Sequence, residues 1–351
     1  MTPRSTVLNR NGSALLVALF ALLLAGALSA ALAELARLSV ERARMDRDGV
    51  RTWFLAEAGL AETIASIEPG SHFDAPLTAQ PGPLAETGAP GSHTVAFSDD
   101  VDDSPNDPLH DINGRVWLRL AAFGSPPIRR RLEALLERDL DALFPGAVTI
   151  AGDIGTMPEG IALDGRDFDV ASGCTITTTR AARLGLAIPL TAPIPAIDHP
   201  EQINGMGGFP SIARASPANL TSLASGTDAD RFVSGPLPET LGTASSPRFT
   251  LVEGEALVSG DTTGGGALYV GGRLTVSGSL EFTGVVAVGE GIEVTSGGRL
   301  VVCGAVWAAG SPALTGLGTG SIHAASDAIR TAGRVAALPA RPRAKAIREL
   351  F

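Results

Sequence analysis

The sequence predicts an α+β protein with a long N-terminal transmembrane helix, then a small antiparallel sheet, then a parallel β-helix, or β-solenoid. Three observations predict this fold: an uncharged run of 21 residues near the N-terminus, short alternating segments before residue 140, and a glycine repeat in the C-terminal half. With 351 residues, the chain is long enough for about two domains.

We expect five regions along the chain. They are a basic leader at 1–12, a transmembrane and amphipathic helix at 13–68, a small sheet region with an acidic loop at 69–140, a β-solenoid at 141–325 with a Pro- and Ser-rich insertion at about 181–248, and a C-terminal tail at 326–351.

The composition excludes several classes of function. The chain has 42 glycines and 24 prolines but only 5% aromatic residues, which favours glycine-turned β-structure over an aromatic-lined catalytic core. Its net charge is −10, whereas a surface that follows nucleic-acid phosphates is basic, so we expect no nucleic-acid partner. Two cysteines, Cys174 and Cys303, are too few and too far apart for a zinc or iron–sulfur module, and we expect no cofactor.

The uncharged run extends from Ser13 to Ala33. A helix of this length spans roughly 31 Å, which matches a hydrocarbon core of about 30 Å. Its eight leucines, one valine and one phenylalanine give about −3 to −6 kcal/mol for insertion into a membrane. The leucines that we expect to contact lipid or neighbouring helices include Leu15, Leu16, Leu19, Leu22, Leu23 and Leu28.

Three interpretations of this run are open. A signal peptide has a shorter apolar stretch and a small-x-small cleavage site, whereas this run continues into a charged helical pattern. An ordinary single-pass anchor fits the length, but two arginines precede the run and five follow it within about 20 residues. Counted by the positive-inside rule alone, those arginines place the C-terminal bulk in the cytoplasm. The third interpretation depends on the residues on either side of the run.

A short basic leader ends in Asn11-Gly12, and the helix continues beyond the apolar run to the phrase Ala56-Glu57-Ala58-Gly59-Leu60. This arrangement resembles the N-terminal region of PilX-like minor pilins, which are type IV pilus assembly proteins. The resemblance implies that the leader is removed after Gly12, that Ser13 becomes the mature N-terminus, and that the apolar run stays as the first half of a long helix. It also implies that the C-terminal bulk lies outside the inner membrane, against the arginine count.

One residue departs from the pattern of major pilins. Those proteins carry a glutamate five residues after the cut, where this chain has Val17. PilX-like proteins and the GspK-like tip pseudopilins often lack that glutamate. The departure therefore favours a minor component over a major subunit, and it leaves the cleavage at Gly12 to be tested.

The polar half of the helix carries an apolar stripe. Its members recur at intervals of about three, four or seven residues: Leu35, Leu38, Met45, Trp53, Leu60, Ile64 and Ile67. Such a stripe more often faces a protein core than a partner. A helix of about 55 residues is about 80 Å long, however, so lipid or neighbouring subunits must cover its first half.

Two strands are predicted in the middle of the chain, at 93–98 and 115–123. The segment 128–138 fits a strand and a helix about equally well by period; the resemblance to PilX-like proteins favours a strand. An acidic loop between the first two strands holds the one metal candidate, a weak calcium site at Asp99, Asp100, Asp102 and Asp103. Its spacing matches no EF-hand, and a solvated acidic turn is the favoured interpretation.

Glycines punctuate the C-terminal half at intervals of six to seven residues from Gly254 to Gly310. Between them lie apolar triplets such as Leu274-Thr275-Val276 and Ile292-Glu293-Val294. Three triplets make one turn of about 18–20 residues, which predicts a three-sided parallel solenoid. Weaker rungs are expected at 147–152, 161–165, 167–171 and 174–178. Cys174 and Cys303 both fall on expected rungs, where buried free thiols are slightly favoured over a disulfide between the two solenoid blocks.

Catalysis is disfavoured by the motifs. Some solenoids are acyltransferases with a histidine base or pectin-cleaving enzymes with clustered acids, but the five histidines here are scattered without partners at diagnostic spacing. We therefore expect no enzyme and no catalytic residue. The resemblance implies a minor pilin-like component of a type IV pilus or secretion pseudopilus, with the inner membrane and other pilins or pilus assembly proteins as partners and a prepilin peptidase as a possible one. The alternatives are a single-pass envelope protein whose solenoid binds a glycan or protein, and a tethered β-helix enzyme.

Overall fold

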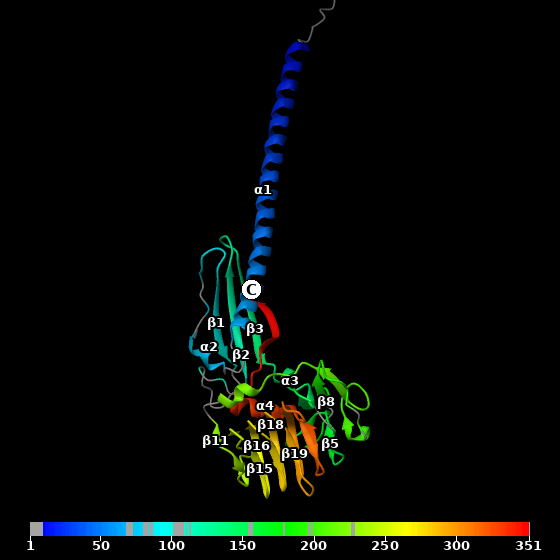
Figure 1. Ribbon diagram of the computed structural model, residues 1–351. Helices are drawn as coiled ribbons and strands as arrows, with labels where there is room; N and C mark the ends of the chain where they lie inside the picture. The colour runs from blue at the N-terminus through cyan, green and yellow to red at the C-terminus, as the bar shows by residue number, and fades with distance from the viewer. Residues whose placement is uncertain are drawn as a thin grey trace, which may run out of the picture.

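The computed structural model describes residues 10–67, 73–79, 84, 87–100, 109, 111, 114–153, 157–177, 180–195, 197, 199–225 and 229–350. The predicted α+β architecture is confirmed: a long apolar helix, a small antiparallel sheet and a parallel β-solenoid follow one another along the chain. Figure 1 shows the helix projecting from a head made of the sheet and the solenoid.

Helix α1 extends from Arg10 to Ser66, which is 57 residues and about 86 Å at 1.5 Å per residue. It holds no proline, and its first half is built from leucine and alanine, which are strong helix formers. The helix ends where the Ile67 N–H bonds to the Ile64 carbonyl oxygen at 3.4 Å. A short helix, α2 (Asp74–Ala79), follows and lies beside the lower part of the small sheet.

The antiparallel sheet has the strand order β1-β2-β3-β23. Its strands are β1 (His93–Asp99), β2 (Arg115–Phe123), β3 (Arg129–Arg138) and β23 (Pro342–Leu350). The segment whose period was ambiguous is thus a strand. One face of the sheet packs against the lower end of α1 through a shared apolar core, to which the sheet contributes Phe97, Val116, Leu118, Leu120, Ala122, Leu132, Ala134 and Leu136.

The C-terminal segment differs from the expected tail. Residues 326–335 form helix α4 (Ser326–Val335), which packs on the solenoid, and β23 then returns to pair with β3. Figure 1 shows this last strand beside β3, close to the lower end of α1. Four of the nine residues of β23 are charged, and its apolar residues change phase after Ala346, so its sequence lacks the continuous alternation that predicts a half-buried strand. The pairing joins the end of the solenoid chain back to the first sheet.

The solenoid has three sides built from parallel strands. One side is a five-stranded sheet in the order β12-β15-β17-β19-β21. A twelve-stranded sheet forms the other two, because the long strands β16, β18 and β20 turn a corner and pair with different neighbours before and after it. The strands of the first side are β12 (Gly235–Pro236), β15 (Ala256–Val258), β17 (Leu274–Val276), β19 (Ile292–Val294) and β21 (Leu314–Gly316).

Before the corner, the long strands share a side with β13 (Thr240–Leu241), β22 (Thr319–Ala324), β5 (Ile161–Asp164) and β9 (Ile203–Asn204). After it, they share a side with β11 (Asp230–Phe232), β14 (Arg248–Val252), β4 (Gly146–Ile150), β8 (Leu184–Pro189) and β10 (Ile212–Ala215). The long strands themselves are β16 (Asp261–Val270), β18 (Ser279–Val288) and β20 (Arg299–Ala308).

The predicted repeat length agrees with the register. Asp261 lies opposite Ser279, and Ser279 lies opposite Arg299, so successive turns contain 18 and 20 residues. Gly266, Gly284 and Gly304 stack at the corner with φ angles of 111°, 143° and 154°, a region that glycine adopts without steric cost. Inward-facing valines, leucines and isoleucines of all three sides form one apolar core.

The order of the turns in space is not the order in the chain. The first block, β4, β8 and β10, builds one end of the solenoid, and the chain then passes to the opposite end and climbs back through β11, β14, β16, β18 and β20. Strand β20 meets β4, and β22 meets β5, so the second block ends where the first begins. Residues 181–248, expected as an insertion, thus supply strands β8 to β14 of the sheets.

A second difference concerns two of the expected rungs. In the described part of these segments, 167–171 and 174–177, there is no parallel strand of the solenoid; instead β6 (Phe168–Asp169) and β7 (Thr175–Ile176) pair antiparallel as a small hairpin. Within this hairpin, Cys174 forms a disulfide with Cys303 of β20, with Cα atoms 6.1 Å apart. The expectation of free thiols is therefore wrong. The disulfide crosses the junction between the two solenoid blocks.

A separate apolar cluster covers one outer side of the solenoid. Helix α4, helix α3 (Leu140–Leu143) and the 3₁₀ turn η2 (Thr221–Ser225) pack on outward residues of β14, β16, β18 and β20. Trp307 lies in this cluster, and its Nε1–H donates a hydrogen bond to the Ala218 carbonyl oxygen at 2.9 Å. Another 3₁₀ turn, η1 (Pro200–Gln202), precedes β9.

Candidate functional site: the N-terminal helix and its junction with the head

The first half of α1 is exposed on all sides. The predicted lipid-facing leucines are between 56% and 72% exposed: Leu15, Leu16, Leu19, Leu22, Leu23 and Leu28. Exposed leucines at this density are unfavourable in water but favourable in a hydrocarbon core. In the described part of the chain, α1 is the one helix long and apolar enough to cross a membrane, which is consistent with a single-pass anchor.

The two predicted processing residues lie at the start of this helix. Gly12 and Ser13 fall within the range of α1, which begins at Arg10, but their side chains lie outside the described part of the structure. Their proposed roles therefore stay predictions. The leader residues 1–9 lie outside the described residues as well.

The Ala56–Leu60 phrase lies where α1 contacts the antiparallel sheet. Ala56 and Leu60 are buried in the core shared with the sheet, whereas Glu57 and Ala58 are exposed on the other face. A Cβ on Gly59 would lie 2.9 Å from both the His93 Cγ and the Leu120 Cδ1 atoms. The small residues therefore let the helix approach β1 and β2 closely.

A second close contact lies one turn earlier on the same helix face. Thr52 is buried, and a Cβ on Gly124, which follows β2, would overlap the Thr52 Oγ1 atom. The Thr52 hydroxyl donates a hydrogen bond to the Asp48 carbonyl oxygen at 2.7 Å, so it needs no partner from the sheet. Above this level the sheet ends, and the stripe residues Leu35, Leu38 and Met45 are exposed.

The outer face of the sheet carries a network of charges. Glu133 of β3 is buried and lies between Arg119 of β2 at 2.7 Å and Arg348 of β23, which also lies over the Trp117 ring. Burial tends to raise the pKa of Glu133, but hydrogen bonds and charge from both arginines outweigh it, so the pKa is lowered. The carboxylate is therefore ionised at neutral pH and ties three strands together.

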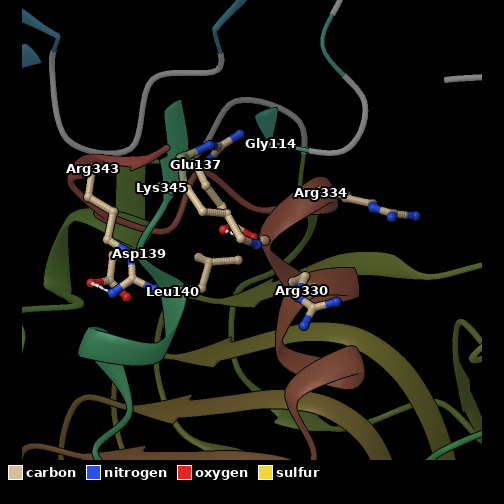
Figure 2. A pocket seen from close by; sticks show the side chains of 10 residues that line it. Gly114, Glu137, Asp139, Leu140, Arg330, Arg334, Arg343 and Lys345 are labelled. Carbon is tan, nitrogen blue, oxygen red and sulfur yellow. Dashed lines mark hydrogen bonds and ion pairs between the residues drawn. The ribbon is translucent and has the colours of Figure 1, made fainter. Parts of the chain in front are cut away.

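A pocket of about 110 Å³ lies between the sheet and α4 (Figure 2). Its cations come from β3, β23 and α4, and ion pairs already engage three of them: Lys345 Nζ lies 2.7 Å from Glu137 Oε2, Arg343 Nη1 lies 3.0 Å from Asp139 Oδ2, and Arg330 Nη1 lies 3.1 Å from Asp327 Oδ1. Burial tends to raise the pKa of Glu137, but Lys345 and Arg115 lower it. Figure 2 shows the Arg330 and Arg334 guanidinium groups turned away from the pocket. The pocket is therefore a polar contact region between the sheet and the solenoid.

The acidic loop is described only in part. Asp99 ends β1 and is buried, and Asp100 follows it, whereas Asp102 and Asp103 lie outside the described residues. Among the residues that the structure describes, no group of three or more histidine, cysteine, aspartate or glutamate side chains could hold a metal ion. The calcium interpretation therefore gains no support.

Two features of the head escaped prediction from sequence. The first is the disulfide at the block junction, for which linear spacing gives no distance. The second is the charge network of the sheet. Its signal was present, because Glu133 and Glu137 alternate on β3 opposite Arg119 and Arg115 of β2, as cross-strand ion pairs do.

Comparisons with known proteins give little further guidance. No family model and no curated protein matches the chain. One solved structure with some similarity is the competence-associated pilin ComZ from Thermus thermophilus, at 10% identity and a TM-score of 0.22, over 86% of this chain and 97% of that chain. This pilin is a weak structural neighbour, and the likeness is too low to support an argument about function.

Proposed function

We propose that this protein is a non-catalytic, minor pilin-like component of a type IV pilus or of a secretion pseudopilus. The observation that carries the proposal is the division of α1 into two halves. The first half is apolar and exposed on all sides, and the second half packs on a four-stranded sheet through Thr52, Ala56 and Gly59. A helix of this kind needs lipid around it before assembly and other helices around it afterwards.

The partners in this proposal follow from the same helix. The inner membrane would hold the apolar half before assembly, and the corresponding helices of other pilins or pilus assembly proteins would replace the lipid. A prepilin peptidase would act between Gly12 and Ser13. The bulk of the solenoid favours a place at the tip or on the side of the filament, where a large subunit does not have to repeat along the shaft.

The disulfide supports a location of the head on the periplasmic or external side of the membrane. Disulfides persist in oxidising compartments and are rare in the cytosol. The bond between Cys174 and Cys303 therefore favours a periplasmic or external head, in agreement with the pilin-like interpretation and against the arginine count. A head of this size crosses the membrane largely regardless of the charges near the helix, which weakens the count further.

The N-terminus of the membrane-extracted protein tests the proposal. Intact mass and N-terminal peptide mass spectrometry are expected to give a mature chain that begins at Ser13. Gly12→Leu is expected to abolish the cut, and Gly26→Leu is the matched control, because Gly26 lies in the same apolar run with open space around it. An uncut wild-type chain would overturn the processed-pilin proposal and favour an anchored envelope protein with a solenoid.

A further inference from the structure

A column of chemically active side chains follows the outer face of the solenoid at the block junction. In the β-strand register, Cys303 of β20 lies opposite His323 of β22, and His323 lies opposite Asp164 of β5. Neighbouring strands lie about 4.8 Å apart, so a cysteine sulfur, an imidazole and a carboxylate occupy consecutive turns. The three residues come from both blocks of the solenoid.

The β6–β7 hairpin lies over this column. Phe168 stacks on the His323 ring with centroids 4.2 Å apart, and Cys174 reaches Cys303 through the disulfide. The two strands of the hairpin pair through two residues each, and both residues of β7 are exposed. The hairpin is attached through Phe168 and the disulfide, through Val170 in the same small apolar cluster, and through Asp167, whose Oδ1 accepts a hydrogen bond from the Ser326 N–H at 2.8 Å.

Cys174 occupies an unusual backbone conformation. Its φ angle is 60°, and it is the one residue other than glycine with a positive φ in the described part of the chain. The left-handed region costs an L-residue about 1–2 kcal/mol, and such residues cluster at functional sites. Cys174 is held there while it is bonded to Cys303.

His323 is placed to exchange a proton with Cys174. Its Nδ1 atom lies 3.7 Å from the Cys174 Sγ atom. Burial lowers the pKa of His323, and the charges that face it are the Asp164 carboxylate, which raises this pKa, and Arg166, which lowers it and is paired with Asp164. The net effect is a lowered pKa, so the imidazole is neutral at pH 7. When Cys174 becomes a thiolate, its negative charge favours the imidazolium, so the ring can take up the proton of the thiol.

The disulfide is reachable from solvent. A groove of about 410 Å³ runs along the outer side of β16, β18 and β20, and both cysteines line it. Cys174 is half-buried, whereas Cys303 is 5% exposed. An incoming thiol therefore meets the Cys174 sulfur first.

We propose that Cys174 and Cys303 form a thiol–disulfide exchange site, in which Cys174 is the exchanging sulfur, His323 is its proton acceptor, and the partner is a protein dithiol of the oxidising compartment. Three features at one place support it: a reachable sulfur, an adjacent neutral imidazole and a cysteine in the left-handed backbone conformation. The proposal does not rest on a role in pilus assembly.

The exchange is balanced as follows. A thiolate of the partner forms a bond to the Cys174 sulfur, and the bond between Cys174 and Cys303 breaks, so that Cys303 leaves as a thiolate and takes up a proton. The second thiol of the partner gives its proton to His323 and attacks the partner's own sulfur in the mixed disulfide, and Cys174 leaves as a thiolate that takes up this proton from His323. Two electrons pass from the partner dithiol to this disulfide. The reverse sequence forms the bond during folding.

The pH dependence of thiol alkylation tests the role of His323. In full-length Cys303→Ser in detergent, Cys174 is the single thiol, and its reaction with iodoacetamide is expected to have a midpoint about one pH unit below the ordinary 8.5 or so. His323→Phe in the same background keeps a ring against Phe168 and is expected to return the midpoint to about 8.5. A thiolate with a lower pKa is also a weaker nucleophile. The alkylation rate at pH 7 is therefore expected to be only about threefold lower with His323→Phe than without it.

A second measurement keeps the proposal testable if Cys303→Ser fails to fold. The wild-type protein is treated with dithiothreitol without denaturant, and the thiols are counted by intact mass while circular dichroism follows the fold. Reduction of the folded protein, slower in His323→Phe, is the expected result. Two results would overturn the proposal and show that the disulfide is a structural cross-link. One is an alkylation midpoint near 8.5 in Cys303→Ser both with and without His323→Phe. The other is reduction of the wild-type disulfide only at denaturant concentrations that unfold the head.

Discussion

Gly304 lies directly against Gly284 of the preceding solenoid turn, so closely that a Cβ on Gly304 would overlap the Gly284 carbonyl oxygen. Gly304 also has a φ of 154°. The same relationship joins Gly284 to Gly266 one turn earlier. The corner of the solenoid is therefore a stack of glycine backbones, in which both the conformation and the lack of a side chain are required.

The corner stack predicts a large effect of adding one methyl group. Gly304→Ala is expected to lower the free energy of unfolding by about 2–4 kcal/mol, because a left-handed conformation and a backbone overlap both oppose the new Cβ. The control is Gly297→Ala, which has a φ of 86° but open space, and is expected to cost about 1–2 kcal/mol. Urea unfolding of the two full-length variants measures the difference. Equal losses would show that conformation alone sets the cost.

The helix–sheet junction predicts a steric effect that depends on helix face. Ala56→Leu places three more heavy atoms against a filled core and is expected to destabilise the head by about 1–3 kcal/mol. Ala58→Leu adds the same atoms to the exposed face of the same turn and is expected to change stability by less than about 0.5 kcal/mol. Thermal unfolding in detergent compares them. Similar unfolding temperatures for both variants would contradict the close approach of α1 to the sheet.

The solenoid was predictable from sequence because its evidence is local. Triplets such as Leu274–Val276 and the glycines between them carry the period of the turn, and the register gives the same 18–20 residues. The contact of β4 with β20 was not predictable, because every turn presents similar apolar residues to its neighbours and no local signal says which turns meet. For the same reason 181–248 looked like an insertion.

The candidate site divides in the same way. The exposed leucines of α1 and the importance of Ala56 and Gly59 were predicted, the first from hydropathy and the second from a family resemblance. The physical reason for small residues there became visible only with the sheet in place. The bond between Cys174 and Cys303 was the slightly less favoured of two alternatives, because 129 residues of sequence separation carry no information about a Cα distance of 6.1 Å.

The buried carboxylate of the sheet predicts a pH dependence. Because the pKa of Glu133 lies below its ordinary 4.5 in the folded protein, its contribution to stability is complete above pH 4.5 and is lost as the pH falls through the lowered value. Glu133→Gln is expected to lower the free energy of unfolding by about 1–3 kcal/mol at pH 7 and by less below pH 4.5.

Urea unfolding midpoints measured across this pH range give the difference in stability between wild type and variant. Glu281→Gln, which removes an exposed pair with Arg299, is the control and is expected to have little effect. A gap that stays constant down to pH 3 would contradict the lowered pKa.

The disulfide predicts where the head loosens when it is absent. The bond closes a loop of 129 residues. By restricting the unfolded chain, a disulfide of this loop length stabilises the fold by about 4–5 kcal/mol as an upper value, and by about 2–4 kcal/mol typically. The double variant Cys174→Ala, Cys303→Ala is expected to lose stability in the typical range and to remain folded, because β4 still pairs with β20 and β5 with β22. Amide hydrogen exchange is expected to rise most in the hairpin at residues 168–176, which would keep the Phe168 stack, the neighbouring Asp167 hydrogen bond to Ser326 and its own short ladder. The control region is β14, three strands away from β20 in the sheet order, where exchange is expected to stay unchanged. A uniform rise across the whole head would contradict local release, and a stability loss below about 1 kcal/mol would show that strand pairing alone holds the two blocks together.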